Sequence, residues 1–277
     1  MEPSLRTLLT GLRFPEAPRW RGDRLYFSDM HAGEVRTVDL VGKSELVVRV
    51  PEEPSGLGWL PDGTLLVVSM RDRKLMRVDA GTLAVVADLS PLAPFHCNDM
   101  VVDARGRAYI GNFGSDIALG GAPVPTCLIL VEPGGRARIV AEDLVFPNGA
   151  VITQDGRTLI VGETFASRLT AFDLAEDGGL SNRRVWAELG AAMPDGICLD
   201  AENAVWVASP FSREILRVAE GGTVHERIAT ERLPIACALG GSDGHTLFVL
   251  TAEHFESAKT VDRSGRIEIV EVAVPGS

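Results

Sequence analysis

The sequence predicts an all-β fold, a six-bladed β-propeller with four antiparallel strands in each blade. One pattern occurs six times along the chain: a polar residue, a short apolar strand, a turn and a second strand. Successive copies begin 39, 43, 50, 47 and 40 residues apart, a period typical of propeller blades. No segment shows an amphipathic helix longer than a turn or two, so the copies are built from strands and turns.

Each copy starts at one equivalent position, called the ring position below. The six ring residues, in chain order, are Glu16, Ser55, Asn98, Asn148, Asp195 and Ile235. The next residue is small in five copies, which lets strands crowd near an axis, and Asp99 is the exception. Because side chains alternate along a strand, we expect residues two and four beyond the ring position, such as Leu57 and Trp59, to share its side of the strand.

A turn follows each ring position by about seven residues, and Asp155-Gly156 is a pair that closes a tight hairpin. The second strand then runs back toward the starting face and ends in a polar residue. These strand-end residues, candidates to support the ring or to face a substrate, are Asp29, Ser69, Asn112, Glu163, Ser209 and Thr251. A third strand alternates apolar and charged residues, as in 74–79, and 83–87 is expected as a fourth, outer strand.

The end of the chain predicts how the ring closes. Segment 267–274 alternates as a strand but has no repeat of its own. We expect it to pair with a strand from 4–10 or to join the sixth blade, which would hide two sheet edges. All of 1–277 then forms a single propeller domain. The longest turn-rich gap, 114–126, is either a lid or rim loop over one face or a plain connection.

Composition narrows the classes of partner. The chain has 27 Lys and Arg against 38 Asp and Glu, a net charge of −11, whereas nucleic acid and anionic membranes attract basic surfaces. No apolar run approaches a membrane span, and 1–12 lacks an apolar stretch of signal-peptide length. We therefore expect a cytoplasmic protein with a small-molecule partner; the acidic surface does not decide its oligomeric state. The four cysteines form no C-x-x-C pair and are interpreted as free core thiols: Cys97, Cys127, Cys198 and Cys237.

The ring residues carry the chemistry. If the six inner strands begin at one face, Glu16 and Asp195 bring two carboxylates to the axis. Asn98 and Asn148 bring two amide oxygens to the same place. Two buried carboxylates side by side are costly unless a cation neutralises them. We therefore expect one divalent cation, with Ca²⁺ first and Mg²⁺, Mn²⁺ or Zn²⁺ as alternatives. The competing interpretation is that Asn and Asp begin these strands only for local hydrogen bonding.

Two other features bear on the substrate. Ile235 breaks the ring, which suggests an asymmetric site with room for a substrate. Three histidines could face that site, namely His31, His96 and His254. His96 is the best placed of them, because it precedes Asn98 by two residues. The plainer alternative for each is a hydrogen-bonded histidine at the rim.

Five motifs are shared with a known family. They are Phe14-Pro15-Glu16-Ala17-Pro18-Arg19-Trp20, Cys97-Asn98-Asp99, Phe146-Pro147-Asn148-Gly149, Met193-Pro194-Asp195-Gly196 and Gly240-Gly241-Ser242-Asp243-Gly244. In this order they resemble the gluconolactonase, senescence-marker-protein and luciferin-regenerating-enzyme family, over essentially the whole chain. The resemblance implies a six-bladed propeller with one divalent cation at its axis and, in many members, hydrolysis of lactones.

The resemblance also implies roles for single residues. Glu16, Asn148 and Asp195 match the direct metal ligands, and Asn98 matches a residue that binds the substrate, or the metal through water. Gluconolactonase-type members have an Arg that grips sugar hydroxyls where this chain has His96, so the departure points to a different or less polar lactone. No substrate-binding carboxylate can be matched in the 114–126 loop, whose one acidic residue is at position 116.

These observations predict a metal-dependent hydrolase that opens a lactone. In this hypothesis the cation polarises the ester carbonyl, Asp195 is the catalytic base toward water, and Asn98 and His96 bind the substrate. One alternative is phosphotriester hydrolysis, an activity of related propellers with a similar centre. Another is a non-catalytic propeller that binds a small ligand around a structural cation. A strictosidine-synthase-like propeller fits less well, because the metal set is intact here.

Overall fold

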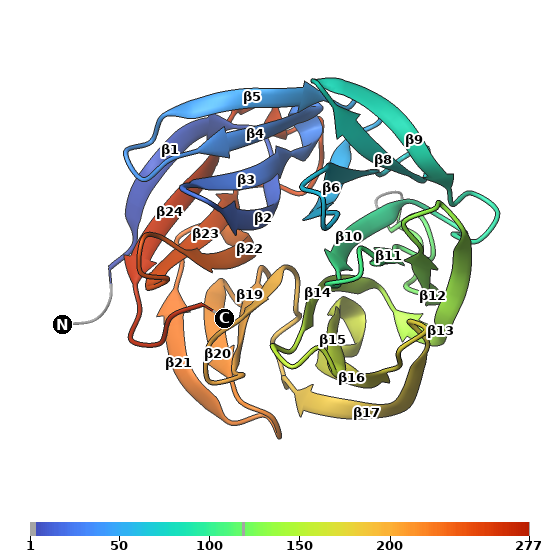
Figure 1. Cartoon of the computed structure of the whole chain (residues 1–277). Coiled ribbons are helices and arrows are strands. Elements are labelled where there is room, and N and C mark those ends of the chain that lie inside the picture. The colour runs from blue at the N-terminus through green and yellow to red at the C-terminus, as the bar shows by residue number, and fades with distance from the viewer. Residues whose placement is uncertain (1–3, 118–119, 277) are drawn as a thin grey trace.

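The structure, a computed structural model, describes residues 4–117 and 120–276. These form six four-stranded antiparallel sheets around a central axis (Figure 1), which confirms the predicted six-bladed β-propeller. The inner strands, next to the axis, are β2 (Pro15–Arg21), β6 (Pro54–Trp59), β10 (Cys97–Val102), β14 (Pro147–Ile152), β18 (Ile197–Leu199) and β22 (Leu233–Gly240). Blades 1 to 6 are numbered below in the order of these inner strands.

The other strands follow in rank from the axis outward. The second strands are β3 (Arg24–Asp29), β7 (Leu65–Ser69), β11 (Ala108–Asn112), β15 (Thr158–Glu163), β19 (Val205–Ser209) and β23 (Thr246–Ala252). The third strands are β4 (Glu34–Val38), β8 (Lys74–Asp79), β12 (Pro125–Val131), β16 (Arg168–Leu174), β20 (Glu214–Val218) and β24 (Gly265–Glu271). The outer strands are β5 (Ser44–Arg49), β9 (Thr82–Asp88), β13 (Ala137–Val145), β17 (Leu180–Glu188), β21 (Val224–Ala229) and β1 (Arg6–Leu12).

Blade 6 is built from both ends of the chain. β24 is its third strand and β1 its outer strand, and the two pair antiparallel with Arg6 opposite Ile269. The C-terminal strand therefore both pairs with the N-terminal strand and joins the sixth blade, so the two expected arrangements occur at once. The strand covers 265–271 rather than 267–274. Beyond it, the chain turns back over blades 5 and 6, where the carbonyl of Pro275 accepts a hydrogen bond from the amide of Ala201 at 2.9 Å.

The apolar core is divided into wedges between neighbouring blades. Six clusters of buried side chains correspond to the six contacts between adjacent sheets. Between blades 2 and 3, for example, Leu66 and Val68 pack with Met100 and Ile110. Because the second strand of a blade is covered on both faces, every residue of β7 is buried. This explains why the second strands are continuous apolar runs rather than alternating ones.

A β-bulge interrupts five of the inner strands just after the ring position. In β2, Glu16 lies opposite Ser28 but Arg19 lies opposite Tyr26, so β2 contains one residue more than β3 there. The extra residue reverses the alternation of side chains. Arg19, rather than Pro18, therefore shares the side of Glu16, and in β2 the expectation for residues two and four beyond the ring position was wrong.

The small residue after the ring position belongs to this bulge. The amide of Gly149 donates to the carbonyl of Asp195 at 3.2 Å, and the amide of Gly196 donates to the carbonyl of Ile235 at 2.9 Å. The inner strands of blades 4, 5 and 6 are thus joined directly at the ring. A methyl group on Gly149 would lie only 2.6 Å from the amide nitrogen of Ile197, so this approach requires glycine.

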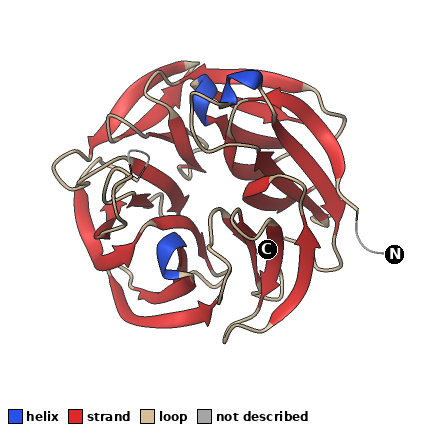
Figure 2. Ribbon diagram, turned by 180° about the vertical axis from the view of Figure 1, so that it is seen from behind, coloured by secondary structure: helices blue, strands red, loops and turns tan. Residues whose placement is uncertain are grey.

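Three short helices stand at the end of the ring where the inner strands begin, called the ring face below (Figure 2). They are η1 (Met30–Ala32), η2 (Thr164–Ala166) and η3 (Thr260–Asp262). Within the described ranges, no helix is long and apolar enough to cross a membrane. The connection from β11 to β12, which contains most of segment 114–126, also lies at this face; Ala118 and Leu119 lie outside the described residues. Within this connection, Ser115 Oγ donates a hydrogen bond to the carbonyl oxygen of Ala122 at 2.7 Å.

Candidate functional site

Five of the six ring residues bring side-chain oxygens to the ring face, each from a different blade. Glu16, Ser55, Asn98 and Asn148 are buried, with at most 7% of each residue exposed, and Asp195 is partly exposed. The hydrogen bonds described next connect them in neighbouring pairs. The structure therefore brings together the residues that the repeat pattern aligned.

Glu16 is held by the neighbouring blade. Ser55 Oγ donates a hydrogen bond to Glu16 Oε1 at 2.5 Å. Ser28, from the second strand of blade 1, donates in turn to the carbonyl of Ser55 at 2.7 Å. Ser55 thus fixes one oxygen of the carboxyl group and leaves the other, Oε2, for a further partner.

Asp195 is oriented by two residues of blade 4. Asn148 Nδ2 donates to Asp195 Oδ1 at 2.6 Å. The same nitrogen lies 3.3 Å from Thr164 Oγ1, which donates to the carbonyl of Pro194 at 2.7 Å. Thr164 was not among the predicted residues. Its one signal in the sequence is that it directly follows Glu163, a strand-end residue at the ring face.

Asn98 makes the equivalent contact between blades 3 and 4. Its Nδ2 lies 3.4 Å from the carbonyl oxygen of Pro147, directly before Asn148. Both ring amides therefore donate to the protein from their nitrogen atoms. The amide oxygens are then the atoms that each side chain can offer to a cation or a substrate.

Burial raises the pKa of both carboxyl groups at the ring. The pKa of Glu16 is raised chiefly by burial and further by the negative charges of Asp195 and Asp99, against the opposing effects of the Ser55 hydrogen bond and Arg19. Burial also raises the pKa of Asp195 to about 8; Asp99 adds to this increase and the Asn148 hydrogen bond opposes it. A divalent cation bound between the two carboxyl groups would favour their charged forms and displace any protons that they hold.

This donor set fits a hard divalent cation. It offers carboxylate and amide oxygens from Glu16, Asn98, Asn148 and Asp195, and no sulfur or imidazole ligand is needed to complete it. The two carboxyl groups supply the negative charge, and their raised pKa values record how costly that charge is without a compensating cation.

Asp99 is a third carboxyl group at the axis; in the sequence it is an exception to the small residues after the ring position and the last residue of the motif Cys97-Asn98-Asp99. It is 6% exposed, and its Oδ1 lies 2.8 Å from Arg19 Nη2. Arg19 also donates to the carbonyl of Met100 at 2.6 Å. Blade 1 is thus tied to blade 3 beside the ring. The signal available in the sequence was a pair of opposite charges on two inner strands, Arg19 and Asp99. Placing Arg19 toward the axis also required knowledge of the β-bulge.

The six strand-end residues lie behind the ring and are at most 4% exposed. In blade 1, Asp29 Oδ1 accepts a hydrogen bond from the amide of Phe14 at 2.8 Å. In blade 5, Ser209 Oγ accepts one from the amide of Met193 at 3.1 Å. Through these hydrogen bonds Asp29 and Ser209 hold the segments that lead into the ring residues, as expected of supporting residues. Like most of the ring residues in front of them, they are buried, and hydrogen bonds such as these favour the supporting role.

Ile235 interrupts the ring of polar side chains, and its own side chain occupies that position. It is 1% exposed and packs in an apolar cluster with Phe14, Met30, Met70 and Ala252. The room for a substrate expected at this position is therefore occupied by side chains of blades 1, 2 and 6. The asymmetry that was predicted takes the form of an apolar side to the ring.

His96 stands at the ring face and is partly exposed. Its ring stacks on Phe95 with the centroids 4.1 Å apart and meets the edge of Phe113 at 5.9 Å. Burial, followed by the positive charge of Arg71, lowers its pKa, so it is neutral at neutral pH. His31 instead contacts Thr260 Oγ1 through Nδ1 at 2.9 Å, and burial lowers its pKa to about 4.

The opposite end of the axis holds a separate cavity of about 240 Å³. It is lined mainly by the far ends of the inner strands, including Trp20, Cys198 and Leu239, and by Gly276 of the C-terminal segment. The cysteines are free thiols, as predicted, although Cys198 is only partly buried where it lines this cavity. The lining is chiefly apolar, and none of the ring residues contributes to it.

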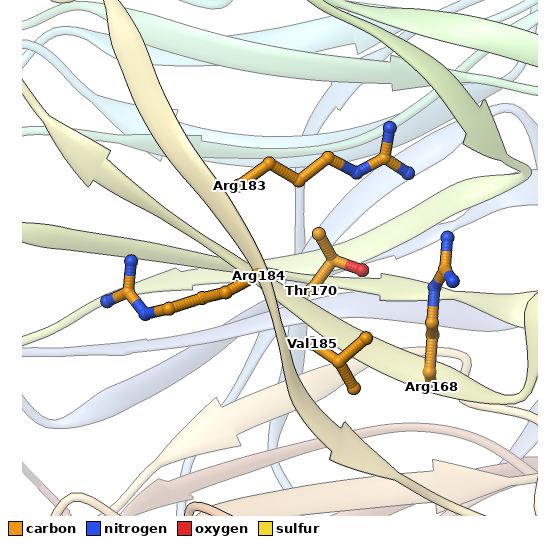
Figure 3. Close-up of a pocket in the computed structure, with 5 residues that line it drawn as sticks. All are labelled: Arg168, Thr170, Arg183, Arg184 and Val185. Atoms are coloured by element: carbon orange, nitrogen blue, oxygen red, sulfur yellow. The ribbon is translucent and has the colours of Figure 1, made fainter.

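A shallow depression of about 390 Å³ on blade 4 is rich in arginine (Figure 3). Arg168 and Arg183 point to the same side of the sheet, and both pair with the buried carboxylate of Glu163, at 2.9 and 3.3 Å. Arg184 points the other way and pairs with Asp173 at 2.7 Å. Their charges are thus largely compensated within the blade.

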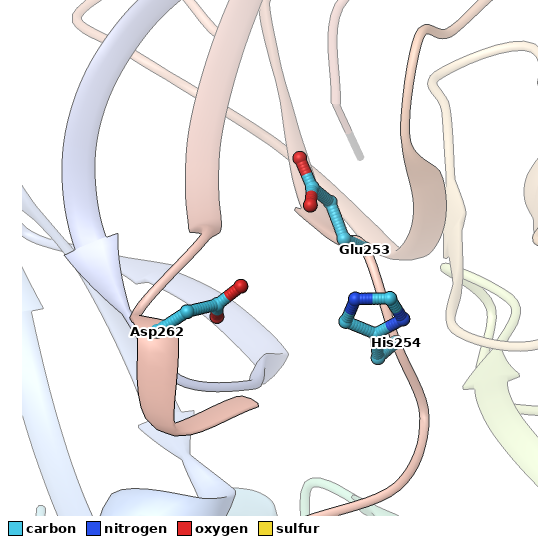
Figure 4. A group of neighbouring side chains, drawn as sticks. All are labelled: Glu253, His254 and Asp262. Carbon is cyan, nitrogen blue, oxygen red and sulfur yellow. The ribbon is translucent and has the colours of Figure 1, made fainter. Parts of the chain in front are cut away.

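Glu253, His254 and Asp262 gather at the rim of the ring face in blade 6 (Figure 4), with potential ligand atoms within 4.8 Å of one another. Glu253 already forms an ion pair with Arg232, and both carboxylates are exposed. His254, a candidate to face the substrate, belongs to this outer group rather than to the ring. Exposed groups of this kind are common without any ion.

Comparison with known proteins agrees with this architecture. A 6-deoxy-6-sulfogluconolactonase of Pseudomonas putida is 27% identical over 272 residues, which cover 94% of this chain and 92% of that protein. The pentonolactonase XacC of Haloferax volcanii is 28% identical over 257 residues, which cover 89% of this chain and 84% of that protein. The structure of a calcium-binding protein, regucalcin, from Agrobacterium tumefaciens superposes with a TM-score of 0.83 at 22% identity, covering 99% of this chain and 95% of that one.

The family model described as the SMP-30/Gluconolactonase/LRE-like region matches residues 14–253. This range contains all six ring residues, the strands of blades 1 to 5, and the two inner strands of blade 6. The chain therefore belongs to the SMP-30/gluconolactonase/LRE-like family, a family of lactonase-like proteins.

Proposed function

We propose that this protein is a divalent-cation-dependent lactonase that opens a cyclic ester at the ring face. The observation that carries the proposal is the convergence of Glu16 and Asp195, whose raised pKa values mark a site with more carboxyl groups than the one nearby positive charge, Arg19, can compensate. The lactonase names of the relatives described above support the reaction class. Calcium is the first candidate cation, in line with the calcium-binding protein that shares the fold.

Three ring residues would hold the cation: Glu16 through its free Oε2, Asn148 through its amide oxygen and Asp195 through its carboxylate. A divalent cation bound there would supply Lewis-acid polarisation of the ester carbonyl. Ser55 keeps the Glu16 carboxyl group in place, and Thr164 does the same for the Asn148 amide. Glu16 is thus held from the neighbouring blade 2, whereas Asn148 is held from within its own blade 4.

Asp195 is the base toward the attacking water. Its Oδ1 is occupied by the hydrogen bond from Asn148, so Oδ2 is the oxygen that accepts the proton. A nearby positive charge favours the carboxylate form that this role requires. The proton taken from water passes to the alkoxide oxygen that leaves when the ring opens, so lactone and water give one hydroxy acid.

Asn98 and His96 position the ester. The two residues lie at the start of the same inner strand, and Asn98 can present its amide oxygen while its nitrogen contacts Pro147. His96 has a lowered pKa and stacks on Phe95 with Phe113 edge-on beside it, so it offers a flat, weakly polar surface rather than a charge.

The proposal is tested by following hydrolysis of δ-gluconolactone, an aliphatic γ-lactone and dihydrocoumarin in a pH-stat. The protein is stripped with EDTA, and Ca²⁺, Mg²⁺, Mn²⁺ or Zn²⁺ is then added back. We expect turnover to disappear with EDTA and return with a divalent cation. A protein that binds one equivalent of cation and turns over no lactone would instead be a binding scaffold.

Asp195→Asn tests the base. It should lower kcat by about 10²–10⁴-fold, the usual contribution of such a group. The matched control is Asp155→Asn, which removes an exposed carboxylate in a hairpin turn. Calorimetry must show that the Asp195→Asn protein still binds the cation. An unchanged kcat in that cation-loaded protein would rule out the assignment.

A further inference from the structure

The ring face of this chain is lined with aromatic side chains, and this bears on the substrate. Resting on the lactonase function proposed above, we infer that the lactone bears an aromatic or extended apolar substituent rather than a set of free hydroxyl groups. The site is built for a ring-bearing or long-chain ester, and its selectivity comes from two rows of aromatic rings on either side of the ring residues.

The first row runs over blades 3 and 4. It starts with the stacked pair Phe95 and His96 and continues through Phe113, whose ring stacks on Phe146 with the centroids 4.6 Å apart. Phe146 then meets the edge of Phe165 at 5.2 Å. Three of the five are within three residues of Asn98 or Asn148, so the row follows the two ring amides.

The second row runs over blades 1, 6 and 5. His31 packs on Phe14 with the centroids 4.7 Å apart, and Phe14 lies 6.3 Å from Phe255. Phe255 stacks on Phe211 at 5.5 Å. Phe14 precedes Glu16 by two residues, so this row starts beside the first carboxyl group. Phe211 and Phe255 are 55% and 38% exposed, respectively, an unusual exposure for apolar rings that stack on each other.

An apolar cluster joins the two rows beside the ring. Phe14 of the second row and Phe113 of the first both pack against the group that contains Met30, Met70 and Ile235. The ring position of blade 6 is part of this group, so one side of the ring itself is apolar. A substituent leaving the ester toward that side would meet carbon atoms rather than hydrogen-bonding groups.

The aromatic residues are concentrated at this end of the molecule. Seven of the ten phenylalanines lie at the ring face, namely Phe14, Phe95, Phe113, Phe146, Phe165, Phe211 and Phe255. The other three, Phe27, Phe172 and Phe248, are buried between blades. Apart from the buried Phe14, the ring-face rings are partly or fully exposed, and exposed aromatic surface near a polar site is typical of ligand binding.

The charged groups at the same face already have partners. Arg71 pairs with Glu53 at 2.8 Å, and Arg13 Nη2 donates to the carbonyl of Ser257 at 2.9 Å. Arg232 pairs with Glu253. The hydroxyl groups of a sugar lactone would have to compete with these partners for the arginine N–H groups, and a hydroxyl buried without a partner is strongly disfavoured. An apolar substituent requires no such exchange.

The inference is tested with four lactones on the cation-loaded protein: δ-gluconolactone, δ-valerolactone, δ-decalactone and dihydrocoumarin. The first three share one six-membered ring and differ in what it carries. We expect kcat/KM for δ-decalactone and dihydrocoumarin to exceed that for δ-valerolactone by about ten-fold or more, through KM, as burial of an alkyl chain or a ring predicts. δ-Gluconolactone should be the poorest of the four.

Phe146→Ala should lower the ratio of kcat/KM for dihydrocoumarin to that for δ-valerolactone by about ten-fold. Phe172→Leu, in the core of blade 4, is the matched control and should leave that ratio unchanged. A preference for δ-gluconolactone over δ-valerolactone would overturn the inference while the lactonase function stands. An unchanged ratio in a folded Phe146→Ala protein would overturn it as well.

If no lactone is hydrolysed with any cation, the proposed function is wrong. The inference about the substituent is then tested by ligand binding alone. Calorimetry with 3-(2-hydroxyphenyl)propanoate and with gluconate, both at saturating Ca²⁺, compares the two product classes directly. Tighter binding of the aromatic acid by about ten-fold supports the aromatic site. Equal or tighter binding of gluconate overturns it.

Discussion

Arg19 reaches from blade 1 to blade 3, where its Nη2 lies 2.8 Å from Oδ1 of Asp99. The pair skips blade 2, so it crosses the axis rather than joining neighbours. Asp99 is nearly buried, and its pKa is raised by that burial and lowered by Arg19. The same carboxyl group raises the pKa of both Glu16 and Asp195. Arg19 therefore moderates the negative field in which the two proposed cation ligands sit.

Arg19→Met should destabilise the protein by about 3 kcal/mol, because it leaves the buried carboxylate of Asp99 without its partner. Urea unfolding monitored by tryptophan fluorescence measures the loss. The double variant Arg19→Met/Asp99→Asn is the control, since it removes the unpaired charge and should recover much of the stability. If the single and double variants were equally unstable, lost packing of the Arg19 side chain would be the cause instead.

The metal-free protein should become less stable as the pH rises. Burial raises the pKa of Asp195 to about 8 in the folded state, whereas an unfolded Asp titrates near 4. Its neutral form therefore stabilises the fold below about pH 4, and this contribution is lost as the pH rises through about 8. Glu16 acts in the same direction. Thermal unfolding in EDTA at a series of pH values measures the decline.

Asp195→Asn provides the comparison for that decline. In EDTA the variant should match the wild type at low pH and exceed its melting temperature at pH 8, because it never acquires the buried charge. In excess Ca²⁺ the order should reverse at pH 8, since the charged carboxylate then has a partner. A wild-type curve that stays parallel to the variant's in EDTA would contradict the cause given for the raised pKa.

Gly149→Ala should weaken both the fold and cation binding. The added methyl would lie 2.6 Å from the amide of Ile197 and 2.7 Å from the carbonyl of Asp195, both backbone atoms. β14 and β18 would have to separate, which moves Asn148 away from Asp195. Calorimetry should show a Kd for Ca²⁺ raised about ten-fold or more. Gly134→Ala, where nothing lies within 4 Å, is the matched control and should change neither property.

His96→Arg should shift selectivity toward polyhydroxylated lactones. The substitution places a permanent charge with five donors where a neutral imidazole now stacks on Phe95. The ratio of kcat/KM for δ-gluconolactone to that for dihydrocoumarin should rise about ten-fold. His96→Gln, which is polar but uncharged, separates the effect of the charge from that of losing the stacked ring. A ratio that rises equally in both variants would show that the charge is not responsible.

The repeat pattern predicted the blades because each blade repeats one arrangement of apolar and turn residues. The ring residues followed from the same alignment. The bulge did not, since an extra residue leaves no mark in the sequence beyond the small residue that it requires, such as Gly149. Without the bulge, Arg19 could not be assigned to the axis, and the role of Asp99 was missed. The packing of Ile235 also depended on buried side chains of two other blades, which no local pattern contains.

The shared sixth blade makes synthesis of β24 a condition for closing the propeller. β1 leaves the ribosome before the other strands of the propeller, but β24, its sheet partner within the described residues, is made more than two hundred residues later. Until then the growing chain carries an unpaired edge at each end, and closing the circle brings together segments at nearly the greatest possible separation. A nascent chain interrupted before residue 265 would lack β24 and expose the flank of β1 to chaperones, proteases and other unfinished copies.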